Sequence, residues 1–451
     1  MKKFTALLLL TLTALGGARS SSAQIQKRIE ERTGHTLNPS PKPEAFALPE
    51  GISLADGLTE DEAAAIALWN NAAFQLDLTA LGFARADLTE AGQLRNPIFT
   101  LLFPWGPKQL EAYASLPFEA FWQRPRRVAA AKLDYERVAE SLVQTGLNLI
   151  RDVKVAYADL ALATDRARTS SEMTRQQSEI ARIVEARLRA GDISELETNA
   201  SRIDQRVAES TATRFAHEAA IAKDRLRALL GMQPGHPAFE IAPTVKATDT
   251  AWLVNVSTLN AEPTTDEIDK LIRQALAARP DVRAAEIAIE AAGKRAGWER
   301  SKILSIAAII DTNGSGKKGF EAGPGLQAEL PLFNRNEGGV KRAEAELLRA
   351  ARHYAVVRQR VALEIQESLA QLMEARLSLA SWQRPIIQSI EEDARIAEKA
   401  YTNGEVSYLF VLETSRRLND ARLREAEMLA ELRRASAQLE RAMGGKFFEK
   451  H

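Results

Sequence analysis

The chain has 451 residues, of which 45% are hydrophobic and 6% aromatic, and its 60 basic residues balance its 60 acidic ones. A balanced charge gives no support for nucleic acid as a partner, and the absence of cysteine excludes disulfides, thiolate metal sites and a cysteine nucleophile. Ala, Leu, Glu and Arg dominate, which is typical of long helices and coiled coils.

Residues 1–23 have the composition of a secretory signal peptide. Lys2 and Lys3 give a charged start, residues 4–18 an apolar core, and Ser21-Ser22-Ala23 a small-residue cleavage site. A membrane anchor is the weaker alternative, because the apolar run is shorter than the ~18 residues of a spanning helix. No later apolar stretch is long enough either, so a membrane span would require a closed β-barrel.

Residues 24–58 are predicted to form an extended N-terminal arm, because four prolines interrupt any regular period: Pro39, Pro41, Pro43 and Pro49. Thr59 and Glu62 then form a capping box, which begins a helix that is expected to run to about Leu94.

A β-hairpin is predicted over residues 98–117. In its second strand, apolar residues alternate with Glu111, Tyr113 and Ser115, so one face is apolar and the other polar. Such a strand suits a transmembrane barrel, with Glu111 and Tyr113 toward the lumen. An ordinary soluble hairpin explains this stretch equally well. The basic residues that follow, Arg124, Arg126 and Arg127, suit either the membrane boundary or a basic helix start.

A very long helix is expected from Arg126 to a turn at Gly191, about 98 Å at 1.5 Å per residue. After this turn, a shorter helix is expected to run back in the opposite direction from Ser194 to Leu230. Residues 233–263 form an irregular equatorial linker, and Thr264 and Glu267 then provide a second capping box. A second hairpin over 303–331, a second turn at Gly404 and a tail at 445–451 complete the chain.

The spacing of the glycines shows that the chain is internally duplicated. Gly191 and Gly404 are 404 − 191 = 213 positions apart, as are Gly231 and Gly444. The two repeats span residues 59–232 and 264–444. In each, the two shorter helices together match the long one, so we expect them to stack end to end beside it.

The expected fold class is therefore mainly α with a small β part. Four strands per chain are too few to close a membrane barrel, but three chains would supply about twelve.

Several stretches resemble the outer-membrane efflux protein (TolC) family. They are Leu-Pro-Leu-Phe-Asn-Arg at 330–335, Arg-Pro-Ile-Ile at 384–387 before Tyr401-x-x-Gly404, and Leu-Glu-Arg-Ala-Met-Gly at 439–444. The resemblance, which covers nearly the whole chain, implies a homotrimeric duct. Its twelve-stranded barrel would sit in the outer membrane, and its long helices would form an α-barrel that extends into the periplasm. It implies no enzymatic chemistry and no cofactor. A periplasmic coiled-coil adaptor or structural protein is the alternative, but an adaptor should show lipoyl-like modules, which the sequence lacks.

The implied partners are outer-membrane lipid, a periplasmic adaptor (membrane fusion) protein and an inner-membrane pump of the RND or ABC type. The cargo stays open between metal ions, drugs and secreted protein. The five histidines are scattered, so no metal site is predicted.

The resemblance also suggests functional residues. The turns at the periplasmic tip are expected to contact the adaptor, although the glycines also suit plain helix caps; the contact residues are Leu188, Gly191, Ile193, Ser194, Tyr401, Gly404, Val406 and Ser407. Aperture residues are Glu413, Phe410 and Glu197, of which Glu413 could equally be a solvated helix acid. In the second hairpin, Gln327 and Glu329 are assigned to the barrel lumen by alternation.

Overall fold

The computed structural model describes residues 27–32, 34–36, 46–103, 110–233, 236–242, 264–303, 305–314, 320–383, 386–403 and 405–445. The predicted signal peptide, part of the N-terminal arm, most of the equatorial linker, Gly404, Pro385 and nearly all of the tail lie outside these residues. The chain divides into two units. Unit 1 comprises residues 1–75, 145–278 and 361–451, and unit 2 comprises residues 76–144 and 279–360.

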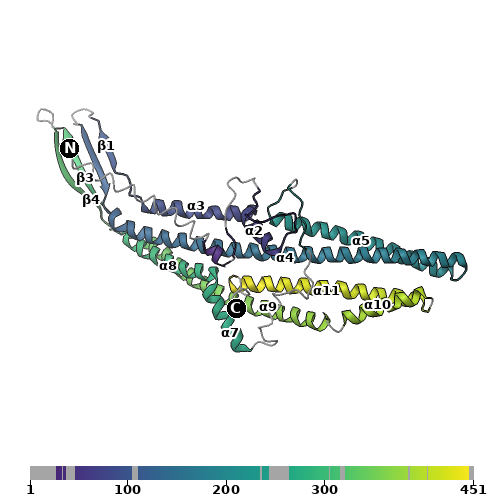
Figure 1. Cartoon of the computed structure of the whole chain (residues 1–451). Helices are drawn as coiled ribbons and strands as arrows, with labels where there is room; N and C mark the ends of the chain where they lie inside the picture. Colours follow the sequence, from purple (N-terminus) through teal and green to yellow (C-terminus); the bar gives the residue numbers. More distant parts are fainter. Residues whose placement is uncertain are drawn as a thin grey trace. The chain divides into compact units, whose positions relative to one another are not determined.

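The same order of elements occurs twice (Figure 1). The first series is α2 (Glu60–Asn70), α3 (Ala72–Gly92), β1 (Ile98–Leu102), β2 (Glu111–Pro117), α4 (Ala120–Ala190) and α5 (Glu195–Leu229). The second is α7 (Thr265–Ala278), α8 (Pro280–Ser301), β3 (Ser305–Gly314), β4 (Phe320–Glu329), α9 (Glu337–Gln383), α10 (Ile387–Thr402) and α11 (Tyr408–Met443). The fold is mainly helical with one four-stranded antiparallel sheet, as predicted. The segment boundaries drawn from the sequence stay a prediction.

The described helices include none with the length and apolar character needed to cross a membrane.

The duplication is visible in the hydrogen bonds that end the helices. At the end of α4, the Asp192 amide donates to the Arg187 carbonyl at 3.0 Å, and 213 residues later the Glu405 amide donates to Ala400 at 2.9 Å. Gly191 has a φ of +81°, the left-handed conformation that this cap requires. The helices α4 and α10 therefore end in the same backbone turn, one in each repeat.

The end of α5 packs against the junction of α2 and α3 in unit 1. The Asn71 side chain donates from Nδ2 to the Leu229 carbonyl at 2.9 Å, while its Oδ1 accepts from the Phe74 amide. Gly231 has a φ of +70°, and a Cβ there would lie 2.1 Å from the Asn70 carbonyl oxygen. Only glycine fits this approach. The helix expected from Glu60 to about Leu94 is broken into α2 and α3, and the end of α5 meets this break rather than the end of one continuous short helix.

The first long helix begins earlier than predicted. α4 starts at Ala120 rather than Arg126 and contains Pro125. A proline this early removes one backbone bond, and side chains support the helix start. Arg124 donates to the Gly92 carbonyl at 2.6 Å, and Arg127 donates to Ala91 and Gln93. Two of the three arginines therefore satisfy the free carbonyls at the end of α3, where cationic groups are favoured.

The second long helix is interrupted. α9 ends at Gln383 and α10 begins at Ile387, on either side of the position where the sequence has Pro385.

The sheet of unit 2 has the strand order β1-β2-β3-β4, with antiparallel neighbours throughout. Residues that face each other in the register lie on the same side of a sheet. β2 joins β3, so the hairpins of the two repeats form one surface, while β1 and β4 lie at its edges.

Candidate functional site

One face of the sheet carries acidic and polar side chains, together with the apolar Ile98, Leu102 and Ile309. The register aligns Glu111 with Asn313 and through it with Glu321, and aligns Tyr113 with Asp311. Gln327 and Glu329 lie on this face as well, because each is an even number of residues from Glu321. The four residues assigned to the lumen from sequence therefore share one face.

The other face of the sheet is apolar. Phe99, Ile310 and Leu326 are 69%, 60% and 72% exposed there. Its one hydroxyl group, Thr312 Oγ1, donates to the Ala112 carbonyl at 2.8 Å and so presents no free donor. The other members are Leu101, Ala112, Ala114, Leu116, Ile306, Ala308, Ala322, Pro324 and Ala328. A sheet with one apolar and one acidic face can separate lipid from water.

Sequence reasoning missed two acids of the polar face, Asp311 and Glu321. The stretch before Asp311 is almost continuously apolar, so it shows no alternation from which a face could be assigned. The pairing of Asp311 with Tyr113 shows on which face of the sheet Asp311 lies. This pairing joins residues of different repeats, so it cannot be read from one strand alone.

At the tip of unit 1, Tyr401 is buried rather than presented to a partner. It is 4% exposed, and the guanidinium of Arg187 lies 4.7 Å from its ring centroid. Arg187 also donates to the Tyr401 carbonyl at 3.4 Å. This cation–π contact joins α4 to α10, so Tyr401 holds the two tip turns together within one chain.

The other described tip residues lie at the surface or partly buried. Gly191, Ser194 and Ser407 are exposed, while Leu188, Ile193 and Val406 are half-buried. Ser194 caps α5, since its hydroxyl accepts from the Glu197 amide at 3.3 Å. Sequence reasoning missed two more exposed apolar residues, Leu196 at 80% and Leu409 at 72% exposure. They are 213 positions apart, so the duplication itself relates them.

The aperture residues do not form one cluster of free acids. Glu413 is exposed but forms an ion pair with Arg417 one turn later. Phe410 is 51% exposed in the first turn of α11, and Glu197 lies in the first turn of α5, where an acid is favoured by the helix dipole.

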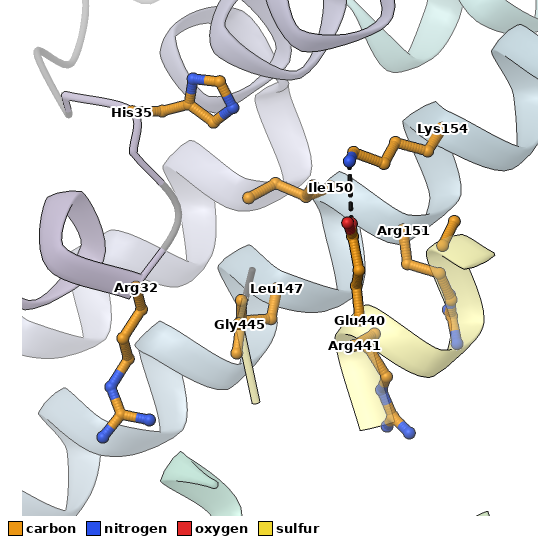
Figure 2. A pocket seen from close by; sticks show the side chains of 10 residues that line it. Arg32, His35, Leu147, Ile150, Arg151, Lys154, Glu440, Arg441 and Gly445 are labelled. Carbon is orange, nitrogen blue, oxygen red and sulfur yellow. Dashed lines mark hydrogen bonds and ion pairs between the residues drawn. The ribbon is translucent and has the colours of Figure 1, made fainter. Parts of the chain in front are cut away.

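Lys154 is the centre of a charged cluster in unit 1. Its ammonium lies 2.8 Å from Glu440 (Figure 2). It also lies 3.8 Å from Asp61 and 3.9 Å from Glu60, and only 12% of its side chain is exposed. Burial raises the pKa of Glu60 to about 7, against the attraction of Lys154. Burial alone would lower the pKa of Lys154, but the surrounding carboxylates raise it. The cluster ties α2, α4 and α11 together.

The cavity beside this cluster is about 20 Å³, room for about one water. Within the described ranges, no group of three or more His, Cys, Asp or Glu side chains could hold a metal ion.

Comparison with known proteins decides the family. The model of the family described as outer membrane efflux protein matches residues 64–232 and 271–445, more than half of the chain. The chain belongs to this family. The family's members are non-enzymatic outer-membrane channels that extend into the periplasm and form trimers in tripartite efflux systems. The family match thus favours the channel over the adaptor alternative.

This outer membrane efflux protein is similar to proteins whose names state a function. It is 23% identical over 398 residues to the cobalt-zinc-cadmium resistance protein CzcC of Cupriavidus metallidurans, covering 86% of this chain and 91% of CzcC. It is 26% identical to the cation efflux system protein CusC of Escherichia coli K12, covering 68% of this chain and 66% of CusC. A crystal structure of CusC has the same fold, with a TM-score of 0.68 at 21% identity over 91% of this chain and 98% of that one.

Proposed function

We propose that this chain is the exit duct of a system that exports metal cations. The observation that carries this proposal is the acidic face of the sheet, on which each chain places Glu111, Asp311, Glu321 and Glu329. Carboxylates that line a pore favour cations. The names of CzcC and CusC, which refer to cobalt, zinc, cadmium and cations, support the same cargo.

Three copies would close a twelve-stranded barrel with the acidic face toward the lumen. The unpaired edges of β1 and β4 support this closure, since exposed backbone groups cannot remain in lipid. With four carboxylates per chain, the lumen would carry twelve. The apolar face would then meet outer-membrane lipid.

The tips would dock with a periplasmic adaptor, and through it with an inner-membrane pump of the RND or ABC type. Leu188, Gly191, Ile193 and Ser194, with Gly404, Val406 and Ser407, are the proposed contacts, joined by the exposed Leu196 and Leu409. Small and apolar groups at a turn suit packing against helices of a partner. Tyr401 would act indirectly, by fixing the turns to each other.

Phe410 is proposed to narrow the aperture near the tip, with Glu413 and Glu197 adding negative charge. The ion pair of Glu413 with Arg417 reduces its contribution, so we expect the apolar ring of Phe410 to dominate this constriction.

The cation duct is tested by the selectivity of the purified channel in a planar bilayer with a KCl gradient. The wild-type channel is expected to give a cation-selective reversal potential. Replacing all four acids of the polar face by glutamine should shift that potential toward zero, because the lumen loses its fixed charge.

Gln327→Ala is the matched control, because it alters the same face without changing charge, and it should leave the potential unchanged. An anion-selective wild-type channel, or a quadruple variant with unaltered selectivity, would contradict the proposal.

A further inference from the structure

Unit 2 contains a cavity of about 690 Å³ between three of its helices. Residues of α4 line one wall, residues of α8 line the floor, and residues of α9 line the other wall. The volume lies in the range of cavities that hold small organic molecules. The lining residues therefore deserve to be read as a ligand site.

An ion-pair network fixes how the three helices lie beside one another. Arg295 of α8 pairs with Asp134 of α4 and lies 3.9 Å from Glu346 of α9. α4 and α9 run away from the sheet, since they follow β2 and β4, whereas α8 precedes β3 and runs toward it. Residues a given number of positions after Asp134 and Glu346 therefore lie level with residues the same number of positions before Arg295.

The floor of the cavity is apolar and narrow. Six of the described residues that line it are alanines, five of them on α8, and Val357 of α9 adjoins them. Ala291 and Ala292 are only 2% and 5% exposed, so the floor lies below the surface of the unit. It follows α8 from Arg295 back to Asp281, which is about 21 Å of helix. Such a floor suits an extended hydrocarbon chain.

The size of the cavity argues against a helix of another protein as its occupant. A helix with its side chains is about 10–12 Å wide, so over about 21 Å it would fill roughly 1,600 Å³ or more. This is more than twice the volume of the cavity. A slender small molecule fits instead.

Cationic side chains line both walls next to the ion-pair network. Arg137 and Arg349 lie three residues after Asp134 and Glu346, about 4.5 Å further along their helices. They are therefore level with each other and with Ala292 of the floor. An anion between the two walls can accept hydrogen bonds from both guanidinium groups, the geometry that carboxylates favour.

The acids that line the cavity already have cationic partners. Asp134 and Glu346 lie beside Arg295. The third acid, Asp281, accepts a hydrogen bond from Arg279 at 2.6 Å. None of the three is left to neutralise the cations of the two walls.

The cations of the walls are in excess. Arg349, His353 and Arg360 line the cavity from α9 and have no hydrogen bond or ion pair with another residue in the described ranges of the chain. Arg137 lies 3.6 Å from Asp134 but retains further N–H donors, because one carboxylate does not occupy the whole guanidinium group. The cavity thus combines an apolar floor with uncompensated positive charge.

We propose that this cavity binds an amphiphile with a slender alkyl chain and an anionic head group. The head group lies between Arg137 and Arg349, with the Ser141 hydroxyl and the His353 imidazole about one turn further along, and the chain lies along the alanines of α8. The proposal goes beyond the cation duct and does not depend on it, because none of these residues belongs to the sheet.

The test is the binding of radiolabelled decanoate to the full-length protein in nanodiscs of neutral phosphatidylcholine. Equilibrium dialysis measures it, with binding to empty nanodiscs subtracted. Decanoate should bind saturably. Decanol has the same chain without the charge, and acetate has the charge without the chain, so each should compete at least about tenfold less well than unlabelled decanoate. Absence of saturable binding, or equal competition by decanol or acetate, would overturn the proposal.

A pair of arginine variants tests the position of the head group. Arg349→Gln should weaken decanoate binding about tenfold, because the head group loses a charge-assisted hydrogen bond. Arg352→Gln is the matched control, since Arg352 is an exposed arginine of the same helix outside the cavity, and it should bind like the wild type. Both side chains are exposed, so neither change should disturb folding. Equal affinities of the two variants would show that the head group lies elsewhere.

A change in the floor tests the position of the chain. Ala288→Leu should abolish saturable binding, because the larger side chain fills the space above the floor. Ala351→Leu, at an exposed position of α9 outside the cavity, is the control and should keep it. Thermal unfolding shows whether Ala288→Leu is folded. Wild-type affinity in a folded Ala288→Leu protein would contradict the proposed site.

Discussion

The carboxyl group of Glu60 makes the stability of unit 1 depend on pH. Its pKa in the folded chain is about 7, raised from 4.5 chiefly by burial. A raised pKa means that the folded state binds the proton more tightly than the unfolded state. The resulting stabilisation is complete below pH 4.5 and is lost as the pH rises through about 7.

We therefore predict a higher thermal unfolding midpoint at pH 6 than at pH 8, and a flatter profile in Glu60→Gln. The pKa change corresponds to at most about 3 kcal/mol, and less in practice because the side chain keeps 32% of its surface exposed. Asp56→Asn, an exposed acid nearby, is the control and should keep the wild-type profile. A Glu60→Gln profile as steep as that of the wild type would contradict the assignment.

Gly231 tests how closely the helix ends meet. Gly231→Ala should lower the unfolding midpoint more than Gly191→Ala. Both residues have positive φ, which costs about 1–2 kcal/mol for alanine, but only at Gly231 would the new Cβ collide with a backbone oxygen. Thermal unfolding of the two variants measures the difference. Equal decreases in the unfolding midpoint of the two variants would mean that residue 231 does not lie close to the Asn70 carbonyl oxygen.

At the scale of elements, Arg187 couples α4 to α10. Arg187→Ala removes the contact with the Tyr401 ring, worth about 1–2 kcal/mol when desolvated. Hydrogen exchange of the amides near Tyr401 should then accelerate about 5–30-fold. Arg189→Ala, whose side chain hydrogen-bonds within its own helix, is the control. Unchanged exchange in Arg187→Ala would show that the turns are held by other contacts.

The sequence sufficed for features that depend on local chemistry. Gly191 and the capping boxes at Thr59 and Thr264 are recognisable because their roles are fixed by a few neighbouring residues. The start of α4 was missed because Pro125 suggests an end, whereas the bonds of Arg127 to α3 are made across 36 residues.

Partners distant in the chain explain the remaining differences. Tyr401 was predicted to be a surface contact, and its burial depends on Arg187, 214 residues earlier. Asp311 joins the acidic face only through its pairing with β2. Such contacts leave no periodic pattern in one sequence, so the position of a side chain could be predicted only where an alternation fixes it.

For the whole molecule, the two repeats build a surface that one copy leaves incomplete. The sheet of unit 2 has two edge strands, β1 and β4, each of which pairs with a neighbour on one side only. Closure by further copies would pair these edges, and under the proposed function it would place the acids of the sheet around a common lumen. Assembly and the proposed cation passage would thus both follow from the edges and faces of one sheet.

The most direct test is the metal content of cells that lack this chain but retain its adaptor and pump. Cells grown with cobalt, zinc or cadmium are assayed by elemental mass spectrometry. We predict that at least one of these metals accumulates, and that the wild-type chain, but not a chain with all four acids of the polar face replaced by glutamine, restores its content. Unaltered metal content, or full restoration by the quadruple variant, would contradict a cation duct lined by these carboxylates.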